Sequence, residues 1–171
     1  MRTMKIEARF TSKQNRLYTV SGEEQNVKDC VRVNAKEWLG SGAPSPEARK
    51  LLCIEVNWSD IGLDEDSYDE AFLAELRDAL KNLEEKNVFA FIKPVCGSAS
   101  FNAESFTASC KHCARRIKDA ASVIGFAIPA EFTAPPDVEL FIEELSAKHA
   151  HYVFFSQNPE IIALKTEIVQ F

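Results

Sequence analysis

Buried-strand patterns alternate with helical patterns from Leu51 to the end of the sequence. The expected strands are the apolar runs at 51–58, 88–95, 122–129 and 151–156. The expected helices lie at 64–87, 103–121, 136–150 and 158–171. A strand recurs at intervals of roughly 30 residues, the length of a βαβ unit. Because strands that are buried on both faces form parallel sheets covered by helices, this pattern predicts an α/β fold with a parallel sheet built from successive βα units.

Two arrangements of such units fit the sequence. One is part of a TIM-barrel-like (β/α) barrel, and the other is an open doubly wound sheet. The residues before Leu51 follow a different pattern, since alternating stretches at 5–10 and 16–20 flank the turn sequence SKQN. This predicts an N-terminal β-hairpin. DCVRVNA at 29–35 predicts one short further strand.

The chain length suits a single hydrophobic core, because two independent domains would be small at 171 residues. We therefore expect one α/β domain over 1–171. Within it, a hairpin region occupies 1–28 and the βα units occupy 29–171.

Charge and composition narrow the classes of partner. The net charge of −6 argues against nucleic acid and anionic membranes, which need basic patches, and is compatible with a neutral ligand such as a sugar. No apolar stretch reaches the ~20 residues of a membrane span. MRTMKIEARF has no apolar run behind its basic residues, so it does not resemble a signal peptide. The sequence has five cysteines, an odd count that indicates reduced thiols. The reduced thiols and the lack of a signal-peptide pattern together predict a cytoplasmic protein.

Cys110 and Cys113 lie in the sequence CKHC, inside an expected helix. A structural zinc site needs four ligands, usually two such pairs, and the sequence has no second pair. Residues three apart share one face of a helix. The spacing therefore predicts two core thiols, and we expect neither a metal nor a cofactor.

The residues just after each strand are the candidates for a functional site, because both arrangements place ligands at the carboxyl ends of the strands. For ligand binding these are Asn57, Trp58, Lys93 and Asn158. Trp58 could stack on a sugar or could close the core as a buried lid. Lys93 could reach an anionic group or could be an ordinary surface lysine.

Part of the chain, from Leu52 to Phe132, resembles the cellulase-type glycoside hydrolases, which are (β/α)8 barrels of the family 5 kind. The similarity is carried by Trp58, by YDEAFL at 68–73 and by EEKNVFAFI at 84–92. It continues through FTASCKHCARRIKDAASVIGFAIPAEF. The resemblance implies that this sequence corresponds to the first half of the barrel. Glu131 stands where the family has the Glu of Asn-Glu-Pro, which implies a general acid/base role for Glu131.

The sequence departs from the family pattern at several functional positions. Ala130 replaces the Asn that would bind a sugar hydroxyl, and Cys53 stands near the position of the family's Arg. KPVCGS stands where a His is expected after the third strand. The family's nucleophile lies on a strand later than those this sequence provides.

Glycoside hydrolysis needs two carboxyl groups, about 5 to 5.5 Å apart in retaining enzymes and about 6.5 to 9.5 Å apart in inverting enzymes. Glu160, after the next strand, is the only candidate partner for Glu131 at an equivalent position. It falls in the first turn of an expected helix, where Glu is also common because of the helix dipole. We therefore predict a glycoside-hydrolase-like protein without hydrolytic activity that binds carbohydrate weakly.

Two alternatives remain open from the sequence. The first is a protein-interaction module with no ligand pocket, and the second is a glycosidase that is active only as an oligomer. A homodimer is also expected, because an incomplete barrel leaves open sheet edges and an apolar concave face.

Overall fold

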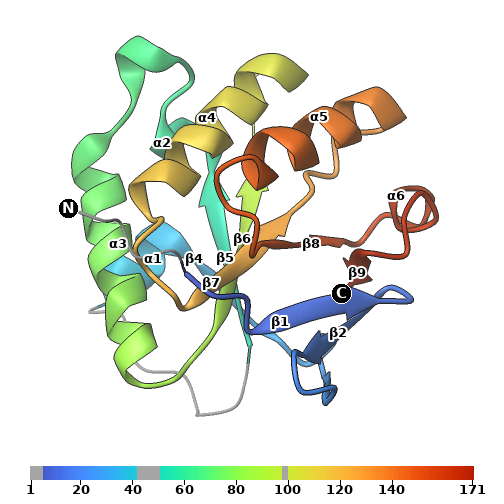
Figure 1. Cartoon of the computed structure of the whole chain (residues 1–171). Coiled ribbons are helices and arrows are strands. Elements are labelled where there is room, and N and C mark those ends of the chain that lie inside the picture. The colour runs from blue at the N-terminus through green and yellow to red at the C-terminus, as the bar shows by residue number, and fades with distance from the viewer. Residues whose placement is uncertain (1–5, 42–50, 98–99) are drawn as a thin grey trace.

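The main sheet of the protein is parallel, and its strands follow one another in space as they do along the chain (Figure 1). The structure is a computed structural model that describes residues 6–41, 51–97 and 100–171. Within these residues the sheet has six strands. They are β4 (Val31–Asn34), β5 (Leu52–Asn57), β6 (Ala90–Val95), β7 (Val123–Ala127), β8 (Val153–Ser156) and β9 (Ile168–Gln170).

The strand order decides between the two expected arrangements. The order is β4-β5-β6-β7-β8-β9, and each neighbouring pair is parallel. A doubly wound sheet reverses its strand order at a switch point, and the described strands show no reversal. Sequential parallel strands are the arrangement of a (β/α) barrel, which takes eight strands to close. The partial barrel is therefore confirmed and the doubly wound alternative is wrong.

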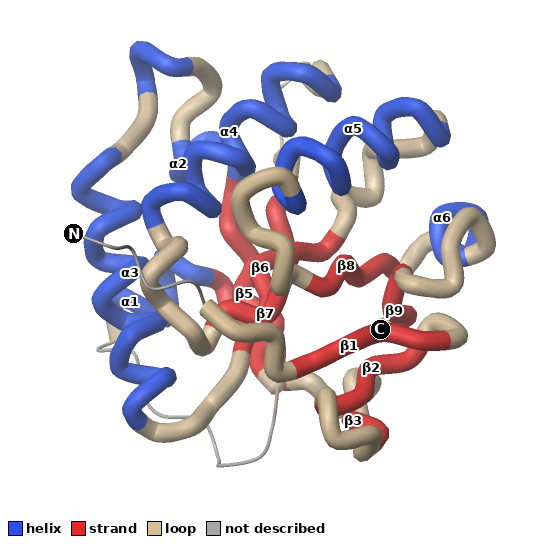
Figure 2. Tube along the Cα trace, viewed as in Figure 1, coloured by secondary structure: helices blue, strands red, loops and turns tan. Residues whose placement is uncertain are grey.

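The helices cover one face of this sheet, which we call the outer face (Figure 2). They are α1 (Ala35–Gly40), α2 (Trp58–Ile61), the 3-10 turn η1 (Glu65–Ser67), α3 (Glu70–Glu85), α4 (Ala103–Arg116), α5 (Pro135–Ser146) and α6 (Pro159–Ile162). Capping side chains fix where two of the long helices begin. The side chain of Asp69 accepts a hydrogen bond from the Phe72 amide, and that of Asn102 accepts one from the Ser105 amide.

The two faces of the sheet have separate apolar clusters. On the outer face, side chains such as Ile54, Ile92 and Phe126 pack beneath the helices. Cys110 and Cys113 belong to this cluster and are fully buried on α4, so the expectation of core thiols is confirmed. Burial raises the pKa of both thiols, that of Cys113 to about 12.

The opposite, inner face is covered by the two ends of the described chain. Phe91 and Phe155 stack here with ring centroids 4.1 Å apart, and Phe171 packs on Phe91 at 5.0 Å. Leu17 from the N-terminal hairpin joins the same cluster and is 1% exposed. An apolar inner face that an incomplete barrel would leave open is therefore buried by the protein's own chain.

The N-terminal strands form a separate antiparallel sheet, β1 (Phe10–Lys13), β2 (Arg16–Thr19) and β3 (Glu24–Gln25). Gln14 and Asn15 make the turn between β1 and β2, both with positive φ (51° and 61°), as a two-residue hairpin turn requires. The hairpin is confirmed, but its first strand was expected at 5–10, which is too early. The turn is QN, because Ser12 and Lys13 still pair with β2.

The expected closing helix at 158–171 is wrong. Only Pro159–Ile162 is helical, and the chain returns as β9, which pairs with β8. Ile168 and Val169 are β-branched and fully buried, one on each face of the sheet. Burial on both faces favours a strand over an amphipathic helix at this position.

Candidate functional site

The loops after β5, β6, β7 and β8 lie together at the carboxyl end of the sheet, and we call this surface the rim. The β6–α4 and β7–α5 loops contact each other there, since the Phe101 and Phe132 rings lie 5.2 Å apart. The Glu131 carboxylate is close enough to the Cys96 thiol to raise its pKa, after burial as the main cause. The topology thus brings Glu131 beside the end of the neighbouring strand.

Glu131 is exposed in the turn that follows β7. Within the described residues it has no hydrogen bond or ion pair from a neighbouring side chain, so its carboxylate is available to a ligand. Its chain neighbour Phe132 is fully buried and anchors the turn among the rings of Phe106 and Phe141. The turn therefore exposes the Glu131 carboxylate, while the packing of Phe132 in the aromatic core fixes its position.

Trp58 does not provide the expected stacking surface. It is 3% exposed, its indole N–H donates a hydrogen bond to the Ser109 hydroxyl (2.9 Å), and its ring packs on Phe106 at 4.8 Å. The Ser109 hydroxyl donates in turn to the Gly62 carbonyl (3.0 Å). A sugar platform needs an exposed ring face, so the structure corrects this hypothesis in favour of a buried lid.

Asn57 and Lys93 are engaged with neighbours inside the protein. The Asn57 amide donates to the Asp60 carboxylate (3.3 Å), and Asp60 also pairs with Lys36 (3.2 Å). The Lys93 ammonium lies 3.8 Å from the Glu55 carboxylate, its register partner on β5. Both side chains are half-buried. Lys93 is therefore neither a plain surface lysine nor a cation free for an anionic ligand.

Asn158 and Glu160 belong to the start of α6. The Asn158 side chain accepts a hydrogen bond from the Glu160 amide (3.0 Å), which is an N-cap interaction. The Glu160 side chain is exposed in the first helical turn. Neither side chain has a described contact with Glu131, and both positions are explained by capping and by the helix dipole.

Phe101 is a rim residue that the sequence argument missed. It is 37% exposed, and its ring leans on Phe132 (5.2 Å) and on Phe106 (6.0 Å). The available signal was a phenylalanine within the otherwise polar and small segment GSASFNAES, between a strand and a helix. Phe101 takes the place that Trp58 was expected to have, as an aromatic side chain beside the Glu131 turn.

The fold and this rim define a class, the partial (β/α) barrel with its polar loops at the carboxyl ends of the strands. Comparison with solved structures makes the class more specific. The catalytic domain of an endoglucanase from Thermobifida fusca, in complex with cellotetraose, superposes with a TM-score of 0.59 at 9% identity and covers 86% of this chain. A structure described as a glycoside hydrolase superposes with a TM-score of 0.53 at 11% identity and covers 91% of this chain.

The chain spans about half the length of these two structures, 52% and 42% respectively. At these identities the likeness establishes the fold alone, which is a partial (β/α) barrel. No family model matches the sequence, and no curated protein matches it. No helix in the described part of the chain combines the length and apolar character of a membrane span.

Proposed function

We propose that the rim around Glu131 and Phe101 binds carbohydrate and does not hydrolyse it. The observation that carries the proposal is the pairing of an exposed aromatic ring with a free carboxylate on adjacent loops of a glycoside-hydrolase fold. Sugars are bound in this way, with an apolar ring face on an aromatic side chain and hydroxyl groups on polar acceptors.

The chemistry of the neighbouring strand ends supports the proposed lack of hydrolysis. Hydrolysis needs a second carboxyl group within about 5 to 9.5 Å. On one side of β7, strand β6 is followed by Cys96 and Gly97, and on the other, β8 is followed by Gln157 and Asn158. Glu55, on β5, already serves as partner of Lys93. These residues support binding at the rim and supply no second catalytic carboxylate beside Glu131.

Titration calorimetry with cellotetraose tests binding, and release of reducing sugar from a β-glucan tests hydrolysis. We expect weak binding that is reduced at least tenfold by Phe101→Ala and by Glu131→Gln, with no turnover. Val20→Ala is the matched control, because Val20 is an exposed apolar residue at the hairpin, outside the rim. Its affinity should equal that of the native chain.

Two other results would contradict the proposal, and each would favour a different function. Turnover that disappears in Glu131→Gln would support a glycosidase whose second carboxylate comes from another chain. Absence of both binding and turnover across cellulose- and mannan-derived oligosaccharides would contradict a sugar site and favour the protein-interaction module.

A further inference from the structure

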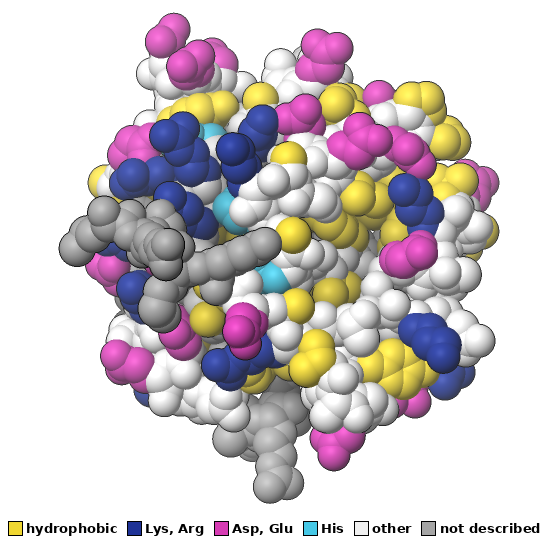
Figure 3. Space-filling view, viewed as in Figure 1, with side chains coloured by type: hydrophobic (Ala, Val, Ile, Leu, Met, Phe, Trp, Pro, Cys, Tyr) yellow, Lys and Arg dark blue, Asp and Glu magenta, His cyan; other side chains and the backbone are white. Residues whose placement is uncertain are grey.

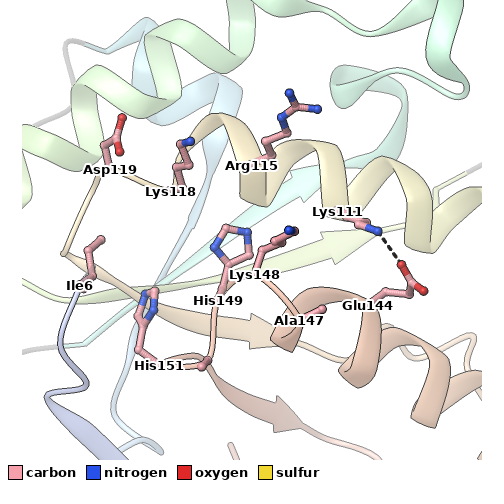
Figure 4. A pocket seen from close by; sticks show the side chains of 11 residues that line it. Ile6, Lys111, Arg115, Lys118, Asp119, Glu144, Ala147, Lys148, His149 and His151 are labelled. Atoms are coloured by element: carbon pink, nitrogen blue, oxygen red, sulfur yellow. Dashed lines mark hydrogen bonds and ion pairs between the residues drawn. The ribbon is translucent and has the colours of Figure 1, made fainter. Parts of the chain in front are cut away.

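A pocket lies far from the rim, where α4 and α5 end and β8 begins (Figure 4), and we call it the basic pocket. In a parallel βα unit, the carboxyl ends of the helices and the amino ends of the strands share one end of the sheet, opposite the rim. The pocket has a volume of about 630 Å³. Its walls come from α4 and the segment after it, from the end of α5 and the segment that leads to β8, and from Ile6.

The pocket is locally basic in a protein of net charge −6. Four cations line it, namely Lys111, Arg115, Lys118 and Lys148, against the two carboxylates of Glu144 and Asp119. Figure 3 shows Lys and Arg side chains gathered beside histidines on this face. Lys111 pairs with Glu144 (2.7 Å), whereas Arg115, Lys118 and Lys148 have no ion pair among the described residues. Three cations without an ion pair among the described residues thus surround one hollow, against the single carboxylate of Asp119.

A buried histidine at the pocket wall is a second, independent observation. His149 is 6% exposed, stacks on the Tyr152 ring at 4.8 Å, and lies between Lys148 and His151 in Figure 4. No side-chain hydrogen bond of His149 to another described residue is present. The buried ring atom without a partner at this wall is the Nε2 atom of the neighbouring His151, and buried polar groups without a partner are rare in proteins. A ligand with acceptor oxygens would give the His151 imidazole the partner that the protein does not provide, and would meet His149 beside it.

Neighbouring groups show which kind of ligand suits the site. The pKa of His149 is lowered to about 4, chiefly by burial, and in part by the charge that His151 carries when it is protonated and by the charge of Lys118. Burial also lowers the pKa of His151, whose Nε2 atom has no partner. Both rings are thus neutral near neutral pH, and each still carries one N–H donor. The pocket combines fixed cations with neutral donors, and all of them suit an anion with several oxygens.

We propose that this pocket binds a small phosphorylated molecule, with the phosphate group held by Arg115, Lys118 and Lys148 and contacted by His149. Arg recognises phosphate with two parallel hydrogen bonds, and Lys adds a mobile point charge. A volume of about 630 Å³ is typical of sites for small molecules and exceeds the needs of a bare phosphate ion. The rest of the ligand therefore lies along the pocket floor between α4 and the segment before β8.

Titration calorimetry at fixed ionic strength tests the proposal with glucose 6-phosphate, glucose and inorganic phosphate as probes. We expect glucose 6-phosphate to bind, phosphate to bind more weakly, and glucose not to bind here. Arg115→Gln and Lys118→Gln should each weaken binding of glucose 6-phosphate at least tenfold. Lys81→Gln removes one charge from an exposed position on α3 and should leave the affinity unchanged.

A readout at the histidines separates a site from general charge attraction. Phosphate should shift the ring resonances of His149 and His151 in NMR spectra and leave those of His112, which stacks on Tyr68 elsewhere, in place. Equal loss of affinity in Lys81→Gln and Arg115→Gln would overturn the proposal, as would absence of binding by both phosphate probes. Tighter binding of a short RNA through the same residues would also overturn it and assign the surface to nucleic acid.

Discussion

His149, in the wall of the pocket between α4 and the segment before β8, shows at the scale of one residue how stability comes to depend on pH. Its pKa is about 4 in the folded protein, against 6.5 for an unperturbed histidine, with burial as the main cause and with the charges of protonated His151 and of Lys118 as further causes. Between these values the unfolded chain binds the proton and the folded chain does not. The free energy of unfolding therefore falls as the pH falls through this window, and the contribution is complete above it.

We predict that this residue makes the protein about 2 kcal/mol less stable at pH 5 than at pH 7. Urea unfolding at the two pH values measures the difference. His149→Phe keeps an aromatic ring on Tyr152 and removes the titrating group, so its loss between the same pH values should be smaller by that amount. An identical pH dependence in the variant would show that the histidine does not carry the effect.

The candidate residues were predicted from the sequence with uneven success, and the reason is side-chain direction. That Glu131 follows a strand end could be read from the chain order, and the structure places it on the rim. Which way Trp58 points depends on Ser109, which is 51 residues away in the sequence. Phe101 stands out in its polar loop sequence, but its position beside the Glu131 turn depends on the packing of its ring on Phe132. Such long-range contacts are not encoded in the local sequence.

At the scale of elements, Gly125 sets how closely β7 and β8 approach. A Cβ atom at this position would lie 1.6 Å from the Val153 carbonyl oxygen, which is backbone and cannot turn aside. The strand is also irregular here, since the register between β6 and β7 shifts next to Gly125. The close approach therefore requires glycine, and any side chain must push the two strands apart.

Gly125→Ala should destabilise the protein by about 3 kcal/mol or more, because the strain falls in a packed core. Gly40→Ala is the matched control. Gly40 is exposed in α1 with nothing within 4 Å of an added Cβ, so that change should be neutral or stabilise the protein by up to about 1 kcal/mol. Thermal unfolding of both variants measures the contrast, and equal melting temperatures would contradict this account of the β7–β8 contact.

Elements with a strong period were predictable, and elements defined by tertiary pairing were not. Helix α3 repeats leucines at helical spacing, and β6 is an apolar run interrupted by one residue, Lys93, so both were identified. β9 has only three residues and follows a helical turn, and its strand character comes from pairing with β8. The first strand of the hairpin was placed too early because the alternation at 5–10 is loose, whereas pairing with β2 defines β1.

At the scale of the whole molecule, the homodimer remains a prediction with a changed basis. The apolar residues of the inner face are covered by the hairpin and by Phe171, so a partner is not needed to bury them. The remaining reason to expect a dimer is the outer edge of β4, because no described strand pairs with it. Light scattering at micromolar concentration measures the state. About twice the chain mass of 19.2 kDa would support the homodimer, and the chain mass itself would contradict it.

Asn15 joins the N-terminal hairpin to the α6–β9 segment by hydrogen bonds. Its side-chain amide donates to the carbonyls of Ile162 (3.0 Å), Lys165 (2.9 Å) and Ile168 (2.7 Å). Its backbone N–H donates to the Thr166 carbonyl (2.8 Å), and its carbonyl accepts from the Gln170 amide (3.1 Å). One residue thus joins segments that are about 150 positions apart in the sequence.

We predict that Asn15→Ala lowers the free energy of unfolding by about 2 to 4 kcal/mol, for two separable reasons. The carbonyls of the α6–β9 segment lose their donors, and alanine is unfavourable at a φ of 61°. Asn15→Gly loses the same hydrogen bonds but tolerates the positive φ, so it should be less destabilising by about 1 kcal/mol. Urea unfolding ranks the native chain, the Gly variant and the Ala variant. If both variants match the native chain, the hairpin is not fastened by this amide, and the apolar contacts of Leu17 with the inner face must hold it in place.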